Sequence, residues 1–190
     1  RDDKELWNKL RAMYEAPLRQ SHPGGHTAVF NSTVYGTDWQ VFMPRAAELF
    51  DSDFLRWGVR RFMKADFIPV AKDISRFKKH MDGHWFQARD AAVQAEAPEP
   101  DWIHCLFPES GIAVLRSGWT PDDMCLVLDA NLAPWGGHAY PGRLSFDFSA
   151  NGMALVTNPG SYLGYTSSEH TKWLDQTLSH NTVMIGGQSQ

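Results

Sequence analysis

Three glycine-containing segments in the second half of the chain carry the residues best suited to acid–base chemistry. Residues 135–140 (WGGHAY) place a histidine and a tyrosine before a predicted strand, residues 158–165 (NPGSYLGY) follow the next strand, and residues 179–181 (SHN) precede another. Imidazole and phenol groups exchange protons and respond to burial and to neighbouring charges. Loops at strand ends are where a rigid sheet commonly presents a site. The spacing alone is equally compatible with three ordinary loops whose histidines are hydrogen-bonded.

The first half of the chain has the apolar spacing of helices. Apolar side chains within residues 6–14 share one helix face, and Pro17 predicts that this helix ends near Ala16. A turn-rich loop follows, in which His22 and His26 flank a Pro-Gly-Gly sequence. These two histidines could reach a sugar, but exposed loop histidines more often have no such role.

Further helices are predicted before a break in the chain near residue 98. One spans residues 37–50, where Pro44 marks either a kink or a new start in a first helical turn. Another follows Asp51 and Ser52, either of which can cap it. Residues 1–97 therefore predict a run of antiparallel helices with short connections.

The pattern changes to strands after the linker Ala95–Pro100. Asn151-Gly152 predicts a hairpin turn, because this pair tolerates the positive φ angles of a type I′ turn. The predicted strands are residues 102–107, 112–116, 124–129, 144–148, 153–157 and 182–185. Residues 98–190 thus predict an antiparallel sheet, half of a sandwich, and the whole chain an α+β fold. So short a sheet leaves its inner face uncovered, so we expect further C-terminal sequence or a separate covering chain.

Composition excludes several classes of protein. The chain has 190 residues, 43% of them hydrophobic, which is enough for a core and excludes intrinsic disorder. The formal net charge of −4 argues against a nucleic-acid partner, because nucleic-acid-binding domains usually carry a basic stripe. No apolar run is long enough to span a membrane, and the chain opens on Arg-Asp-Asp-Lys without a visible signal peptide.

Four separated stretches resemble, in order, motifs of the heparinase II/III-like family of polysaccharide lyases, which includes alginate lyases and heparinases. They are Ser117–Trp119, Gly137–Phe146, Leu155–Gly160 and Thr177–Val183, in register across residues 111–187. The helical half is also similar to the last toroid repeats of the family, with a weaker match from Phe30 to Gly36. The resemblance implies the C-terminal part of an α/α toroid followed by the start of an antiparallel β-sandwich. It also implies that the rest of the protein's own chain lies on both sides of this segment.

The resemblance further implies β-elimination on a uronic-acid glycan. A base removes the weakly acidic C5 proton of a uronate whose carboxylate is neutralised, and an acid protonates the leaving oxygen. His138 matches the first histidine of the family's His-x-His-Ala-Asp motif, and Tyr165 is the expected catalytic tyrosine after the Asp-Pro-Gly motif, with Tyr162 as the alternative. The principal toroid residues of the family are expected upstream of Arg1, so this chain alone is expected to be catalytically incomplete. Substrate contacts are expected from Trp135, Tyr140, Tyr162 and Asn181.

Many family members also bind a structural Zn²⁺, and the resemblance places its ligands at Tyr140, Asn158 and His180. Zinc prefers imidazole, thiolate or carboxylate ligands, so a phenol and an amide make a poor set. The aspartate of the motif is also absent, with Gly142 in its place. We therefore expect a degraded site, in which His180 and Asn158 are the remaining candidate ligands. A metal-free network, with Tyr140 and Asn158 hydrogen-bonded to His180, is the simpler arrangement.

The sequence therefore predicts a polysaccharide lyase that acts on an anionic, uronate-containing glycan such as alginate or a glycosaminoglycan. One alternative is a catalytically inactive carbohydrate-binding relative, which the replacements at Tyr140, Gly142 and Asn158 favour, whereas the retained His138 and His180 oppose it. A second is a uronyl C5-epimerase, which removes and replaces the same proton. A polysaccharide substrate predicts a periplasmic or secreted location.

Overall fold

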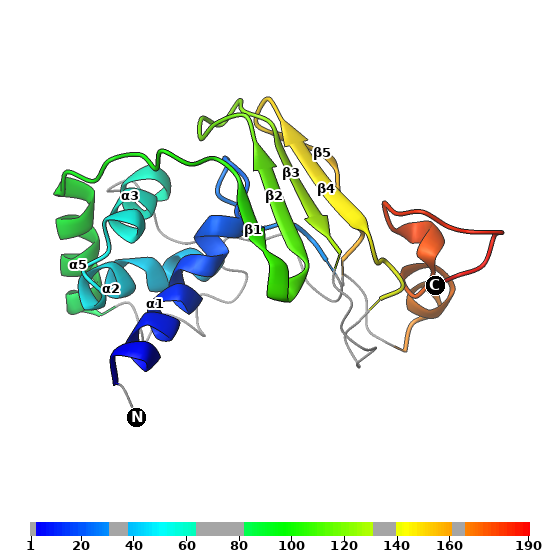
Figure 1. The fold of residues 1–190 in the computed structure, drawn as a ribbon, viewed down its shortest axis with the longest axis horizontal. Coiled ribbons are helices and arrows are strands. Elements are labelled where there is room, and N and C mark those ends of the chain that lie inside the picture. The colour runs from blue at the N-terminus through cyan, green and yellow to red at the C-terminus, as the bar shows by residue number, and fades with distance from the viewer. Residues whose placement is uncertain (1–2, 31–37, 64–81, 131–139, 161–165) are drawn as a thin grey trace. The chain divides into compact units, whose positions relative to one another are not determined.

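The computed structural model describes residues 3–30, 38–63, 82–130, 140–160 and 166–190 (Figure 1). The chain divides into two compact units. One contains the helices between the start of the chain and Asp101, and the other contains the segment that begins at His22 and the strands after Trp102. Helices together with an antiparallel sheet confirm the predicted α+β class. Within the described ranges, no helix has both the length and the apolar character needed to cross a membrane.

Helix α1 (Asp3–Gln20) continues through Pro17, so the predicted end near Ala16 is wrong. A proline inside a helix removes one backbone hydrogen bond and strains the preceding turn. Tertiary packing offsets this cost, because Leu18 is fully buried in contact with the backbone of Gly58. The apolar stripe that precedes Pro17 is mostly exposed. The burial of Leu18, rather than the exposed apolar stripe, therefore favours the continuation of the helix past Pro17.

The helix predicted over residues 37–50 is divided in the structure, and one further helix was not predicted. A short 3-10 helix (Asp38–Phe42) leads into α2 (Met43–Leu49), and Pro44 lies in the first turn of α2, which confirms the interpretation of a new start. Helix α5 (Gly83–Gln94) was not predicted as such. It begins after Asp82, whose Oδ1 accepts a hydrogen bond from a first-turn backbone N–H at 2.9 Å.

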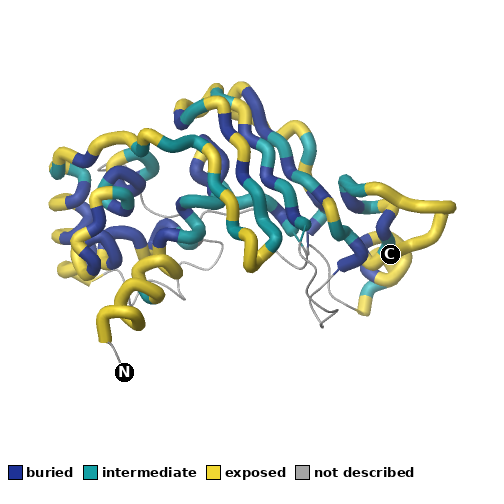
Figure 2. The backbone as a smooth tube through the Cα atoms, viewed as in Figure 1, coloured by how far each residue is buried: buried dark blue, intermediate teal, exposed yellow. Residues whose placement is uncertain are grey.

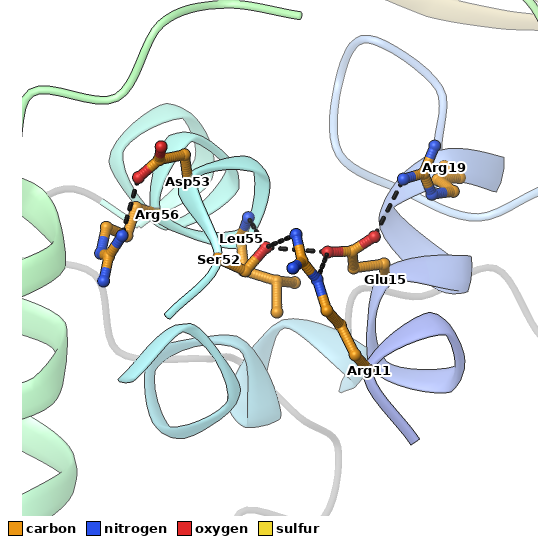
Figure 3. Close-up of polar contacts among 7 residues, drawn as sticks. All are labelled: Arg11, Glu15, Arg19, Ser52, Asp53, Leu55 and Arg56. Atoms are coloured by element: carbon orange, nitrogen blue, oxygen red, sulfur yellow. Dashed lines mark hydrogen bonds and ion pairs between the residues drawn. The ribbon is translucent and has the colours of Figure 1, made fainter. Parts of the chain in front are cut away.

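Helix α3 (Asp53–Phe62) is capped by Ser52, and the cap is shared with α1 (Figure 3). Ser52 Oγ accepts a hydrogen bond from a first-turn N–H at 3.3 Å and donates one to Glu15 Oε1 at 2.8 Å. The buried Glu15 also accepts hydrogen bonds from Arg11 Nε at 2.8 Å and from Arg19 Nη2 at 2.9 Å. Burial raises the pKa of Glu15, but its hydrogen bonds to Arg11, Arg19 and Ser52 outweigh burial and lower the pKa below its ordinary value. The predicted Ser52 cap is confirmed.

The second unit is built on a five-stranded antiparallel sheet whose strands follow one another in chain order (Figure 1). The strands are β1 (Cys105–Phe107), β2 (Ile112–Arg116), β3 (Cys125–Asp129), β4 (Ser145–Ala150) and β5 (Met153–Val156). Asn151 and Gly152 have φ values of 52° and 70°, which confirms the predicted hairpin turn between β4 and β5. The predicted strand at 182–185 is wrong, because only an isolated bridge joins Ile185 to Gln188 and the Ile185 side chain is 82% exposed.

The two faces of the sheet differ in what covers them. One face carries the buried core residues Val114, Cys125 and Val127, against which Ala28 and Phe30 pack. Residues that point to the opposite face alternate with these core residues along the strands, and the burial colours in Figure 2 alternate accordingly. We call this opposite face the open face. Its large apolar side chains on β1 to β4 are Leu106, Leu115, Leu126, Leu128, Phe146 and Phe148. Leu106 is 68% and Leu115 is 52% exposed, so the open face presents apolar side chains to water.

The segment that begins at His22 anchors to the buried face of the sheet. His22 is fully buried, so its expected exposure on a loop is wrong. Its Nδ1 lies 2.6 Å from Ser149 Oγ, a hydrogen bond, and its Nε2 lies 3.0 Å from Asp147 Oδ1 without the alignment of one. Asp147 Oδ2 accepts hydrogen bonds from the Val29 N–H at 3.2 Å and from Thr157 Oγ1 at 3.0 Å. Asp147 therefore joins two strands of the sheet to this segment.

Candidate functional site

Tyr140, His170 and His180 form a buried cluster beside the end of the sheet where β4 begins. The Tyr140 hydroxyl and His170 Nε2 are 3.0 Å apart and hydrogen-bonded. The Tyr140 ring contacts both imidazoles, with centroid distances of 5.6 Å to His170 and 5.7 Å to His180. The C-terminal segment that carries both histidines is coloured orange to red in Figure 1. The cluster thus brings together one predicted site tyrosine, one predicted site histidine and a histidine that the sequence did not indicate.

A single turn positions both histidines. His170–Leu174 forms a π-helical turn, and His180 Nε2 donates a hydrogen bond to the Leu174 carbonyl oxygen at the end of that turn, at 3.1 Å. A carbonyl only accepts, so the proton of neutral His180 is on Nε2. Burial lowers the pKa of His180, and the hydrogen bond to Leu174 opposes that effect only in part. A neutral His180 is therefore the form that this environment favours.

Asn158 and Asn181 connect the cluster to the sheet. Asn158 Oδ1 accepts a hydrogen bond from the Asn181 N–H at 3.2 Å, and its Nδ2 donates to the Phe146 carbonyl oxygen at 3.4 Å. Asn181 Nδ2 donates to the same Phe146 oxygen at 3.3 Å. The hydrogen bonds of Asn158 therefore go to Asn181 and β4, where the sequence predicted one to His180. Both amides hold the ends of β4 and β5 to the C-terminal segment.

Gly142 leaves room for the His180 ring. A Cβ at position 142 would lie 3.0 Å from His180 Cγ and 3.2 Å from its Nδ1. These separations are shorter than ordinary van der Waals contacts, so a larger side chain would displace the ring. The His180 ring therefore packs against Gly142, the position at which the family's motif has an aspartate.

The residues at the family's zinc positions do not fit a zinc ion in this geometry. The Tyr140 hydroxyl is bonded to His170, both polar atoms of the Asn158 amide are engaged, and His180 Nε2 faces a carbonyl. Zinc binds imidazole nitrogen, thiolate or carboxylate, and a phenol and an amide supply neither a thiolate nor a carboxylate. The described part of the chain also contains no cluster of three His, Cys, Asp or Glu residues suited to hold a metal.

The other predicted site residues divide into two groups. His138, Trp135, Tyr162 and Tyr165 lie outside the described residues. Tyr140 is the first described residue after the segment that carries His138, so the cluster fixes the point where that segment joins the sheet unit. Nothing in the sequence pointed to His170, which lies 30 residues from Tyr140, and no spacing rule links the two.

The comparisons with known proteins agree with the motifs. The family model described as "Heparinase II/III-like, C-terminal" matches residues 100–190. This match confirms the predicted resemblance of residues 100–190 to the heparinase II/III-like family.

Individual relatives are lyases of heparin-like glycans. A heparin-sulfate lyase of Bacteroides thetaiotaomicron is 30% identical over 108 residues, which are 51% of this chain and 15% of that protein. A solved heparinase III matches with a TM-score of 0.68 at 20% identity, over 98% of this chain and 25% of its own. A heparan sulfate lyase from Pedobacter heparinus gives a TM-score of 0.68 at 17% identity, over the same shares. The chain thus has the fold of part of these structures and spans about a quarter of their length.

Proposed function

We propose that the protein containing this chain is a lyase that cleaves a uronate-containing glycosaminoglycan of the heparan sulfate type by β-elimination. The observation that carries the proposal is the match of residues 100–190 to the family model, together with relatives named as heparin and heparan sulfate lyases. Alginate, which the sequence also suggested, becomes the second substrate to test. The chain covers 25% of the matched heparinase III, and we propose that residues outside this chain complete the site.

The proposed reaction balances in one elimination. A base takes the C5 proton of the uronate, the electron pair forms a C4–C5 double bond, and the C4–O bond breaks, so that the leaving oxygen takes up a proton. His138 and Tyr165 are the proposed proton-transfer residues of this chain, with Tyr162 as the alternative tyrosine. We assign Tyr140, His170 and Asn158 a supporting role, because their polar atoms are hydrogen-bonded within the protein.

The test is an assay of the full-length protein on heparan sulfate, heparin, chondroitin, hyaluronan and alginate. Elimination leaves an unsaturated uronate that absorbs in the near ultraviolet, and we expect the largest signal with heparan sulfate. His138→Ala should abolish turnover while leaving the fold intact. His84→Ala is the matched control, because His84 is exposed in the helical unit. Unchanged turnover in His138→Ala would remove His138 from the mechanism.

A second candidate is a carbohydrate-binding relative without catalysis, which the departures at Tyr140, Gly142 and Asn158 favour. Affinity for heparan sulfate without ultraviolet-absorbing product would support it. Incorporation of solvent deuterium at C5 without chain cleavage would instead indicate a uronyl C5-epimerase.

A further inference from the structure

The Tyr140–His170 hydrogen bond joins two stretches of chain between which the described residues form no strand pairing. Tyr140 lies at the end of the segment that bears His138, and His170 begins the turn that leads to His180 and Asn181. Both side chains are buried, and the bond between them is 3.0 Å long. The backbone around His170 is itself fixed, because the His170 N–H donates to Ser167 Oγ at 3.1 Å and its carbonyl accepts from the Asp175 N–H at 2.9 Å.

We propose that His170 is a positioning residue, which holds Tyr140 in place, and that this hydrogen bond cross-links the two stretches of chain without a metal ion, beside the positions where the resemblance places zinc ligands. The proposal of a catalytic effect rests on the proposed function, in which His138 transfers a proton. The proposal of a metal-free cross-link is independent of it.

Three features of the cluster support this role. The Tyr140 ring packs on both imidazoles, so its hydroxyl and its apolar surface are both constrained. The His180 ring fits against Gly142, two residues beyond Tyr140, and would not fit against a longer side chain. Asn181 continues the connection, because its carbonyl oxygen accepts a hydrogen bond from the Phe146 N–H of β4 at 3.3 Å. One short stretch, 170–181, therefore touches the approach to β4 at several points.

The variants separate bonding from packing. Tyr140→Phe removes only the hydroxyl, and His170→Leu removes the partner nitrogen while keeping an apolar side chain. His170→Gln is the rescue variant, since its side-chain oxygen can accept from the Tyr140 hydroxyl near the place of Nε2. Tyr14→Phe and His84→Leu are matched controls on exposed residues of the helical unit. All are made in the full-length protein.

We expect Tyr140→Phe and His170→Leu each to lower kcat about tenfold with little change in KM, because a displaced catalytic group slows the reaction more than it weakens binding. The double variant should fall no further than either single variant, and His170→Gln should retain most of the wild-type kcat. Both disruptive variants should also lower Tm by about 2 to 4 °C, again without additivity. The controls should match the wild type.

Several results would overturn the proposal. A kcat per folded molecule that stays at the wild-type value while Tm falls would leave His170 with a purely structural role. Additive losses of Tm in the double variant would show that the two side chains are not coupled. Stoichiometric zinc in the purified wild type, with loss of Tm on chelation, would overturn the metal-free cross-link. If the wild type cleaves no uronate-containing glycan, the proposed function fails, whereas the Tm coupling and metal analysis still decide whether the cross-link exists.

Discussion

The Nε2 atom of His22 lies 3.0 Å from Oδ1 of Asp147, and both side chains are fully buried. The opposite ring nitrogen of His22 is hydrogen-bonded to Ser149 Oγ, two residues further along β4. One imidazole thus bridges two inward-facing side chains of the same strand. The other oxygen of Asp147 binds Val29 and Thr157, so this carboxylate is the centre of the contact between the His22 segment and the sheet.

Replacement of Asp147 by alanine should destabilise the protein by about 2 to 4 kcal/mol, because it leaves the buried Val29 N–H without an acceptor and removes the carboxylate beside the buried His22 ring. Asp147→Asn should cost less, since its amide oxygen can still accept from Val29 and Thr157. Urea unfolding of the full-length variants measures the difference. The matched control is Asp122→Ala at an exposed position, which should change stability by less than about 0.5 kcal/mol. Equal losses at positions 147 and 122 would contradict a central role for Asp147.

Stability should fall as the pH is lowered from about 6.5 towards 4, in part because of His26. Burial and the neighbouring His22 ring, stacked at 4.4 Å, lower the pKa of His26 from 6.5 to about 4, against the attraction of Asp147. Between these two values the unfolded chain binds more protons than the folded one, so acid favours unfolding. Because part of the ring is accessible to water, we expect about 1 to 2 kcal/mol from this group.

The variant His26→Gln should reduce this pH dependence without reversing it. His180, whose pKa burial also lowers, contributes in the same direction and should keep part of the slope. Thermal unfolding at a series of pH values, compared with the wild type, provides the measurement. A slope that is unchanged in His26→Gln would assign the acid sensitivity to other groups.

Ser52→Ala should cost about 1 to 2 kcal/mol, because it removes the cap of α3 and one hydrogen bond to a buried carboxylate. Ser52→Thr keeps the hydroxyl and should lose much less. Ser110→Ala, at an exposed position in the other unit, is the matched control. If the threonine variant loses as much stability as the alanine variant, the hydroxyl is not what stabilises this helix start.

Gly58→Ala should destabilise the protein by about 1 to 3 kcal/mol, although alanine is the better helix former. The added methyl would lie 2.6 Å from Leu18 Cδ2 and 3.1 Å from Met43 Sδ. Gly83→Ala provides the opposite case, because no atom lies within 4 Å of that site at the start of α5. Differential scanning calorimetry should therefore give opposite signs for the two substitutions. A stabilising Gly58→Ala would show that Leu18 moves aside without cost.

Features that depend on neighbouring residues could be predicted from the sequence. The Asn151-Gly152 turn, the Ser52 cap and the restart at Pro44 each depend on a few adjacent residues, and the structure contains all three. The α+β class and the family could also be predicted, because the motifs and the change of period near residue 98 are local patterns.

Features set by distant contacts could not be predicted in this way. The helix continues through Pro17 because Leu18 is buried against Gly58. A contact between residues so far apart in the sequence cannot be predicted from the residues next to Pro17. Residues 182–185 resemble a strand in composition, but within the described part of the chain only one bridge, from Ile185 to Gln188, pairs with them. In the candidate site, Tyr140, Asn158 and His180 could be placed in one cluster from the motifs. Their hydrogen-bond partners could not, because His170 and Asn181 approach through the tertiary fold.

The open face of the sheet has a consequence for any isolated fragment that contains strands β1 to β5. Six leucine and phenylalanine side chains on one face, with Leu106 and Leu115 more than half exposed, favour self-association in water over a dispersed monomer. A fragment limited to these strands should therefore precipitate or form oligomers on refolding. Protein lost to aggregation in this way would be mistaken for a loss of catalytic activity. Polar substitutions at Leu106 and Leu115 should improve the recovery of such a fragment, and in an intact protein the same two changes would report whether another layer buries them.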